Sequence, residues 1–125
     1  MATTISKVWA AATIIMNAVS VTTGSNSDIV DLETDGYEGT HVTIDADFPA
    51  GPTDDLEIEV QASIDGAGFD DTPFDGFTID KDTDPNQVSI IIRDVAQFRI
   101  FAKRSGSTDT ITVTIKSRPW RWQSV

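Results

Sequence analysis

The stretch LEIEVQASID, residues 56–65, alternates between apolar and polar residues without a break. Successive side chains of a β-strand point to opposite faces, so this alternation predicts a strand with one buried face and one face in water. Strands of this kind are typical of antiparallel sheets that cover a core with one side. The expected inward set is Leu56, Ile58, Val60, Ala62 and Ile64.

The same alternation recurs on both sides of this stretch. Four further segments show it: THVTIDADF (40–48), NQVSIIIRDV (86–95), QFRIFAKR (97–104) and DTITVTIK (109–116). Their expected inward residues are Val42, Ile44, Ala46, Phe48, Val88, Ile90, Ile92, Phe98, Ile100, Ala102, Ile111, Val113 and Ile115. NAVSVTTG (17–24) and DIVDLE (28–33) also favour strands, and Gly, Pro and Asp collect between the segments, where turns belong.

About eight strands separated by turns predict an all-β fold, a single antiparallel β-sandwich of the jelly-roll type. The 125 residues are enough for one domain. We expect the sandwich over residues 17–118. Residues 1–16 are expected as an N-terminal arm or a first strand, because WAAATIIM (9–16) suits a helix, a strand or an arm. Residues 119–125 are expected as a C-terminal docking tail.

Charge is distributed unevenly along the chain, whose formal net charge is −11. Residues 1–92 contain two basic residues against eighteen acidic ones, whereas residues 93–125 contain seven basic against two acidic. This asymmetry favours docking on a charged partner or head-to-tail contact between copies. The acidic excess disfavours nucleic acid as a partner, because contacts to phosphate supply most of that affinity.

The side chains that most enzymes need are scarce. There is no cysteine, and the single histidine, His41, is expected as an ordinary exposed residue on the polar side of its strand. A Ser-His-Asp triad or a histidine metal site therefore cannot be assembled convincingly, and we do not expect an enzyme. The apolar run VWAAATIIM (8–16) is too short to span a bilayer, so a membrane is not an expected partner.

The loop DKDTDPN, residues 80–86, has the spacing of a cation-binding loop. Calcium prefers oxygen ligands, and the loop offers them from Asp80, Asp82, Asp84 and Asn86. The start of an EF-hand loop has this spacing, but Pro85 stands where that loop has glycine and Ile91 where it has the bidentate glutamate. The alternative is a solvated acidic loop. A second acidic cluster, Asp65, Asp70, Asp71 and Asp75, is explained by turn chemistry.

The C-terminal segment SRPWRWQSV, residues 117–125, is aromatic and cationic. Its Arg118, Trp120, Arg121 and Trp122 are of the two residue types most enriched at interface hot spots. In an extended chain Trp120 and Trp122 share one side with Arg118, and Arg121 faces the other. We expect this segment to dock on another protein, or to fold back and cap its own sandwich.

A second expected docking element is N-terminal and consists of Val8, Trp9 and Ile14. Ile91 and Phe101 add to it, because they are apolar residues on the faces of their strands that the alternation leaves in water. A sheet covered on both sides would explain them. The segment VWAAATIIM, from this chain or a neighbouring copy, is the expected cover.

Two segments, EVQASIDGAGFDDTP (59–73) and QFRIFAKRSGSTDTITVTIKSR (97–118), resemble small β-sandwich virion proteins of tailed bacteriophages, of the capsid decoration or cement type. The resemblance covers about residues 40–118 and rests on short alternating strands and turn style. It implies a non-enzymatic structural protein on the capsid surface of the virion, in many cases a homo-oligomer. The implied partner is the major capsid protein or another virion protein.

Other functions remain open. One is a carbohydrate- or calcium-binding β-sandwich module of a phage appendage, which would use Tyr37, Trp9 or a C-terminal tryptophan as a stacking platform and the 80–86 loop for calcium. Another is a different virion component, such as a tail or connector part. No cofactor other than calcium is expected.

Overall fold

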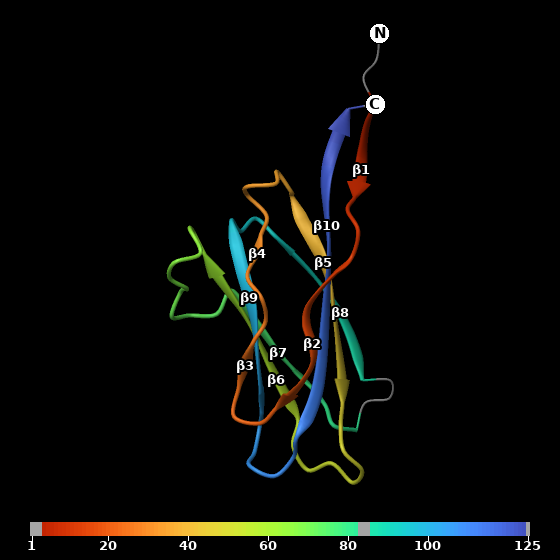
Figure 1. Cartoon of the computed structure of the whole chain (residues 1–125), viewed down its shortest axis with the longest axis vertical. Coiled ribbons are helices and arrows are strands. Elements are labelled where there is room, and N and C mark those ends of the chain that lie inside the picture. Colours follow the sequence, from red (N-terminus) through yellow and green to blue (C-terminus); the bar gives the residue numbers. More distant parts are fainter. Residues whose placement is uncertain (1–3, 83–85, 125) are drawn as a thin grey trace.

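The computed structural model describes residues 4–82 and 86–124, which form ten strands and no helix (Figure 1). The all-β prediction is confirmed, and nothing in the described part is a helix long and apolar enough to cross a membrane. The first sheet contains β1 (Ile5–Trp9), β2 (Thr13–Val21), β5 (Gly39–Asp47), β8 (Gln87–Arg93) and β10 (Ile111–Ser124). The second contains β3 (Ser25–Asn26), β4 (Val30–Asp31), β6 (Leu56–Ser63), β7 (Asp75–Ile79) and β9 (Gln97–Arg104).

Strand pairing is nested along the chain, and every pair is antiparallel. β10 pairs with β1 and β2, β9 with β3 and β4, β8 with β5, and β7 with β6. The contacts β10–β5 and β9–β6 then join these pairs into two sheets. A nested ribbon folded into two sheets is a jelly roll, as predicted. The ten strands occupy eight places, since β1 and β2 follow one another along β10, and β3 and β4 along β9.

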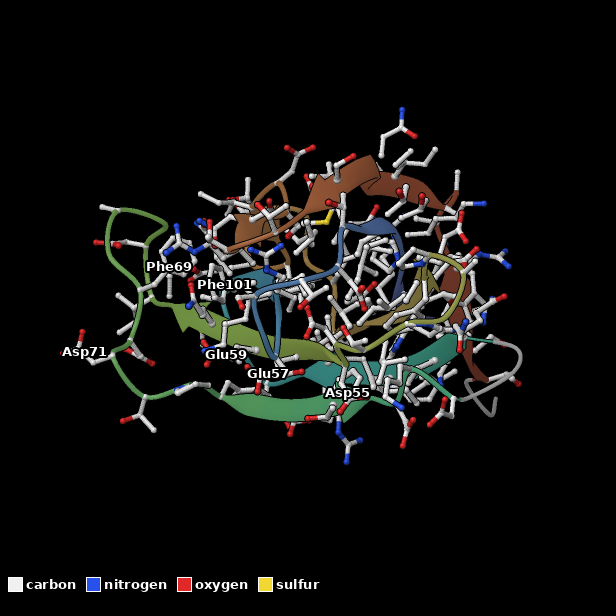
Figure 2. All side chains as sticks on the ribbon, turned by 90° about the horizontal axis from the view of Figure 1, so that it is seen from below. Asp55, Glu57, Glu59, Phe69, Asp71 and Phe101 are labelled. Carbon is white, nitrogen blue, oxygen red and sulfur yellow. The ribbon has the colours of Figure 1, made fainter. Side chains whose placement is uncertain are left out.

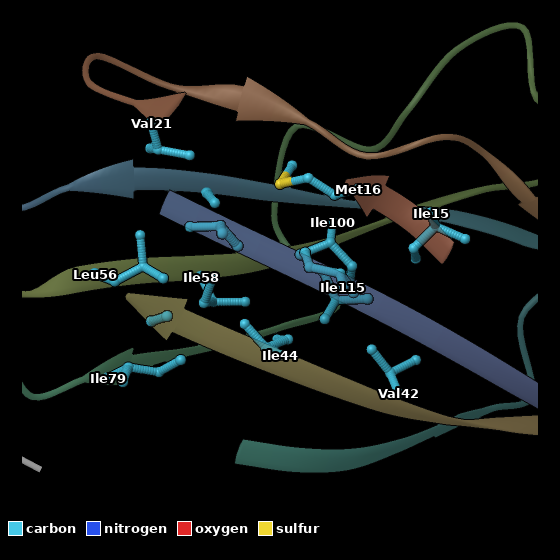
Figure 3. Packing of buried hydrophobic residues seen from close by; sticks show 14 of the residues in the cluster. Ile15, Met16, Val21, Val42, Ile44, Leu56, Ile58, Ile79, Ile100 and Ile115 are labelled. Carbon is cyan, nitrogen blue, oxygen red and sulfur yellow. The ribbon is translucent and has the colours of Figure 1, made fainter. Parts of the chain in front are cut away.

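The core lies between the two sheets and is built from the inward faces of the alternating strands (Figure 3). Every inward residue predicted for β5, β6, β8, β9 and β10 is buried or packs against the core, with one exception. Ile64 was expected inside but is 85 % exposed. β6 ends at Ser63, whose hydroxyl accepts the Gly66 N–H at 2.8 Å, so the chain turns outward before Ile64 reaches the core.

The register of β2 shifts twice against β10. Ile14 lies opposite Lys116 and Met16 opposite Ile115, so Ile15 is an extra residue in a β-bulge. A bulge breaks the alternation of faces, and Ile15 and Met16 are accordingly both buried. Ile14 is left on the outer face of the sheet, where it is half exposed.

The N-terminal segment forms strands, which was one of its expected alternatives, whereas the C-terminal segment is the end of β10 and not a separate tail. β10 continues through Pro119 to Ser124, and β1 pairs with its last five residues. We call residues 5–9 and 120–124 the β1–β10 ribbon, which projects beyond the sandwich (Figure 1). Proline is tolerated at position 119 because it lies opposite Ala10, where β1 has ended and only the Pro119 carbonyl is needed, as an acceptor for the Ala10 N–H.

A reciprocal pair of buried carboxylates, which the sequence did not reveal, joins two loops at the end of the sandwich away from the ribbon. Asp109 Oδ2 accepts the N–H groups of Thr53 and Asp54 at 2.7 and 2.8 Å. Asp54 Oδ2 accepts those of Thr108 and Asp109 at 2.9 and 2.8 Å. The Asp54 and Thr53 N–H groups, with a smaller contribution from Arg104, hold the pKa of Asp109 below its ordinary value.

Candidate functional site: an aromatic groove

The register of the β1–β10 ribbon brings the two expected docking elements together. Trp9 lies opposite Trp120 and Lys7 opposite Trp122. Ala10 donates its N–H to the Pro119 carbonyl, so the adjacent pair Trp9–Trp120 is a non-hydrogen-bonded pair, in which side chains lie closest. All four side chains project from the outer face of the first sheet, because the inward face of β10 carries the core residues.

The three tryptophans form one cluster, defined as Trp9, Trp120 and Trp122. The ring centroids of Trp120 and Trp122 are 5.4 Å apart in an edge-to-face arrangement, and those of Trp9 and Trp120 are 6.5 Å apart. Trp120 is at the centre and only 6 % exposed, whereas Trp9 is 39 % and Trp122 53 % exposed. Trp120 therefore anchors the cluster, and its two neighbours present aromatic surface to solvent. The segment does not fold back over the sandwich, because Trp120 is buried within the cluster on the continuing strand, and docking on a partner stays a prediction.

A cation sits over the cluster. Lys7 Nζ lies 4.3 Å from the ring centroid of Trp120 and 5.5 Å from those of Trp9 and Trp122. The guanidinium carbon of Arg118 lies 5.5 Å from the Trp9 ring, and Arg118 Nε donates to the Ala10 carbonyl at 3.0 Å. Each cation–π contact at an exposed site contributes about 0.5–1 kcal/mol. Lys7 and Arg118 thus help to fix the rings and make the surface positive.

Gly39 provides the space that Trp120 occupies. Trp120, Gly39 and Arg93 lie side by side on β10, β5 and β8. A Cβ added at Gly39 would come within 3.0 Å of the Trp120 ring, of the Arg93 Cβ and of the Ile92 carbonyl oxygen. The missing side chain lets the indole lie across the sheet toward β8.

A groove of about 820 Å³ runs over this face, from the β1–β10 ribbon to β8. We call it the aromatic groove. Among the described residues its lining contains three tryptophans and the cations Lys7 and Arg93, but no carboxylate, although the chain has twenty acidic residues. It is lined by Lys7, Trp9, His41, Ser89, Ile90, Ile91, Arg93, Trp120 and Trp122. Its chemistry suits an acidic ligand with apolar or planar groups.

Ile91 and Phe101, predicted as one covered outer layer, lie on different sheets. Ile91 borders the aromatic groove and is 70 % exposed. The ring of Phe101 packs against Gly24 on the outer side of the second sheet (Figure 2). The N-terminal segment does not cover either residue in this chain, because it extends the edge of the first sheet along β10.

The predicted interface residues Val8, Ile14 and Arg121 do not line the groove. Val8 lies opposite Arg121, and both face the other side of the ribbon from the tryptophans. Ile14 shares the outer face of the first sheet with Lys116. The ribbon therefore has one aromatic, cationic face and one mixed face.

Of the predicted calcium ligands that the structure describes, Asp80 and Asp82 are engaged within the protein, whereas the buried Asn86 Oδ1 has no hydrogen-bond partner among the described residues. Asp80 Oδ1 accepts the Asp82 N–H at 2.7 Å, and Asp82 Oδ2 pairs with Lys81 Nζ at 2.7 Å. Asn86 contributes its backbone carbonyl to the Ala46 N–H, and Asp84 lies outside the described residues. Within residues 4–82 and 86–124, no three histidine, aspartate or glutamate side chains gather as a metal site would require.

The groove residues that the sequence did not single out for binding are Lys7, His41, Ser89, Ile90 and Arg93. His41 is exposed, as predicted, and it lines the groove beside Ile91. Lys7 belongs by position to the acidic part of the chain, and only the β1–β10 pairing moves it next to the basic segment. The one local pattern that could have indicated the contact of Lys7 with the tryptophan cluster is its position two residues before Trp9, on the same side of a strand. Tyr37, an alternative stacking residue, packs against the core and borders a different groove.

In comparisons with known proteins, no family model, no curated protein and no solved structure matches this chain.

Proposed function

We propose that this protein is a non-enzymatic virion structural protein, a capsid decoration or cement subunit that binds and stabilises a capsid lattice. The observation that carries the proposal is the β1–β10 ribbon, which presents Trp9 and Trp122 beyond the sandwich next to Arg118 and Arg121. Exposed tryptophan with arginine is the composition of interface hot spots. Viral capsid domains are among the common uses of the jelly roll, and the resemblance of residues 59–73 and 97–118 points the same way.

The mechanism is multivalent attachment on the capsid surface. A ribbon of five residues per strand offers a small contact, which is weak alone. Copies held on a repeating lattice by several such contacts bind far more tightly, because each later contact forms at high effective concentration. The major capsid protein is the expected partner of the ribbon.

Particle binding tests this function. The protein is co-expressed with the major capsid protein encoded in the same genome, and the particles are separated on a density gradient. Replacing Arg121 and Trp122 by alanine is expected to weaken attachment by about 10- to 100-fold. Lys103→Ala is the matched control, since it removes a partly exposed cation from β9 in the second sheet, outside the ribbon. Undiminished attachment of the ribbon variant would remove the ribbon from the mechanism, and absence of the wild-type protein from particles would refute the function.

The aromatic groove favours a second candidate, a carbohydrate-binding module of a phage appendage. Indole rings stack on sugar faces, and Trp9 and Trp122 both present exposed ring surface beside the groove. Titration with purified host-surface polysaccharide, followed by tryptophan fluorescence, tests this candidate. A rise in melting temperature with calcium would extend it to the 80–86 loop. If the protein is instead a tail or connector component, it should fractionate with those parts of the virion.

A further inference from the structure

The aromatic groove has a chemical counterpart on the same chain, the loop of residues 64–75, which connects β6 to β7 and includes Asp75, the first residue of β7. This loop contains four aspartates and no basic residue. It also presents two exposed hydrophobic side chains, Ile64 at 85 % and Phe74 at 51 % exposure. An acidic loop with apolar anchors matches a groove of cations and indoles in both charge and polarity.

The loop is held in shape by its own hydrogen bonds. Asp65 Oδ1 accepts the Ala67 N–H at 2.9 Å, and Phe74 donates its N–H to the Val60 carbonyl at 2.7 Å. The Asp70 N–H bonds to the Ala62 carbonyl at 3.0 Å, and Arg99 covers the Phe69 ring at 4.0 Å. A loop that is ordered before binding loses little conformational entropy on binding.

Loop 64–75 and the aromatic groove cannot meet within one molecule. The loop extends from the second sheet, where Asp71 projects away from the sandwich (Figure 2). The groove lies on the outer face of the first sheet, on the side of the β1–β10 ribbon and β8 (Figure 1). Two copies, in contrast, can join these surfaces without any change of fold.

We propose that the aromatic groove of one copy binds loop 64–75 of a second copy. Phe74 packs on the exposed indoles, and Asp70 and Asp71 pair with Lys7 and Arg93. The two surfaces differ, so the contact is heterologous, and each copy retains a free groove and a free loop for further neighbours. Such contacts close into rings or continue as chains. This inference goes beyond attachment to a capsid and does not depend on it.

A single loop in a groove buries less than the roughly 800 Å² per partner of a standard stable interface. Assembly in solution is therefore expected to be weak and dependent on concentration. Because the contact pairs exposed charges, about 1 M salt is expected to dissociate it.

Sedimentation velocity on the full chain, without any particle, tests the contact. The groove variant carries Ile91→Asp and Arg93→Glu, and the loop variant carries Asp71→Asn and Phe74→Ser. Each variant alone is expected to be monomeric, with its self-association weakened by about tenfold or more. An equimolar mixture is expected to stop at heterodimers, since only the intact loop of one variant and the intact groove of the other can pair.

All four substitutions change exposed side chains, and Lys7→Glu serves as a second groove variant in case the double variant fails to fold. Glu33→Lys is the matched control, because it reverses an exposed charge outside both surfaces and should assemble like the wild type. A wild-type protein that stays monomeric at high concentration would overturn the proposal. So would variants that assemble as well as the wild type, or a mixture without heterodimers. A monomer that still binds particles would assign the groove to the capsid protein and leave the proposed function intact.

Discussion

Trp120 shows how far the position of one side chain depends on residues distant in the sequence. It is the most buried of the three tryptophans, yet it projects from the outer face of the first sheet. Its burial comes from Trp9 on β1, from the Lys7 ammonium and from the space above Gly39 on β5. A change at any of these neighbours should therefore be visible in the fluorescence of the cluster.

Gly39→Ala is the most selective of these changes. The new methyl group must displace the Trp120 ring or the Ile92 carbonyl, each 3.0 Å away, so we expect a loss of about 1–3 kcal/mol in the free energy of unfolding. Urea denaturation gives that value, and the tryptophan emission should shift as Trp120 moves. Gly68→Ala is the control, because a Cβ there meets nothing within 4 Å. Equal stability of the two variants would contradict the account of Gly39.

Asp109 should make the stability depend on pH in the acid range. Its pKa in the folded protein is lowered by the N–H groups of Asp54 and Thr53, so the folded state binds this proton less readily than the unfolded chain. The stabilisation is complete above about pH 4, the range of an ordinary aspartate, and is lost as the pH falls through the lowered folded-state value. Denaturation of the wild type should therefore show a free energy of unfolding that declines below about pH 4.

Asp109→Asn should reduce the stability at neutral pH and flatten that decline, because the titrating carboxylate is gone. Asp47→Asn is the control, because it removes an exposed carboxylate from β5. In this variant Asp109 should still contribute to the acid slope, the decline of the free energy of unfolding below about pH 4. The same acid slope in Asp109→Asn as in the wild type would contradict the role given to the carboxylate pair.

At the scale of elements, β10 is the strand on which the site depends. Its first part, Ile111 to Ser117, lies between β2 and β5, and its last part pairs with β1. The same strand therefore supplies core residues at one end and the aromatic cluster at the other. β1 is a short edge strand, and the strand with which it pairs is β10.

Val8→Pro should detach β1 while the sandwich stays folded. The Ala10 N–H points to β10, and because direction alternates along a strand, the Val8 N–H does too. Proline removes this donor, so we expect a loss of about 1–3 kcal/mol and a red shift of tryptophan emission as Trp120 becomes exposed. Ile5→Pro is the control, since the Ile5 N–H points away from β10. Unchanged emission in Val8→Pro would show that β1 does not bury Trp120.

At the scale of the whole molecule, the nested jelly roll joins the two ends of the chain. Ile5 lies opposite Ser124, and β2 is paired to β10 across most of the sequence. The negative charge of the long acidic segment lies largely elsewhere, and the groove is left without a carboxylate among its described lining residues. The topology therefore brings Lys7 and Arg93 together in one groove of an acidic protein.

This topology should make folding slow for a chain of this length. Nearly all strand pairs are distant in sequence, so loop-closure entropy is lost before the contacts that offset it can form. We expect refolding in milliseconds to seconds, measured by stopped-flow tryptophan fluorescence. The fluorescence change that reports burial of Trp120 should occur in the last phase of refolding, because β1 and β10 are the outermost pair of the nested topology and pair last. A refolding reaction complete within microseconds would contradict this expectation.

The sequence by itself determined the strands β5, β6, β8, β9 and β10, their buried faces and the class of fold, but it did not indicate β7. Alternation between apolar and polar residues is a local property, so Leu56, Ile58 and Val60 reveal the inward face of β6 without any knowledge of its neighbours. The prediction was wrong at Ile64, where a side chain-to-backbone hydrogen bond at Ser63 ends the strand, and it missed the bulge at Ile15. Turn and bulge geometry is not contained in the alternation.

Only the tertiary structure decided which strands meet. Alternation states which face a residue occupies but not which strand lies beside it, because a two-residue period is the same in every strand. The contact of Lys7 with Trp120 and the reciprocal bonds of Asp54 and Asp109 join residues that are far apart in the chain. The carboxylate bonds exist because β10 lies beside β5 and β9 beside β6. The contact of Lys7 exists because the first strand closes on the last, and that closure places an aromatic, cationic groove on an acidic protein.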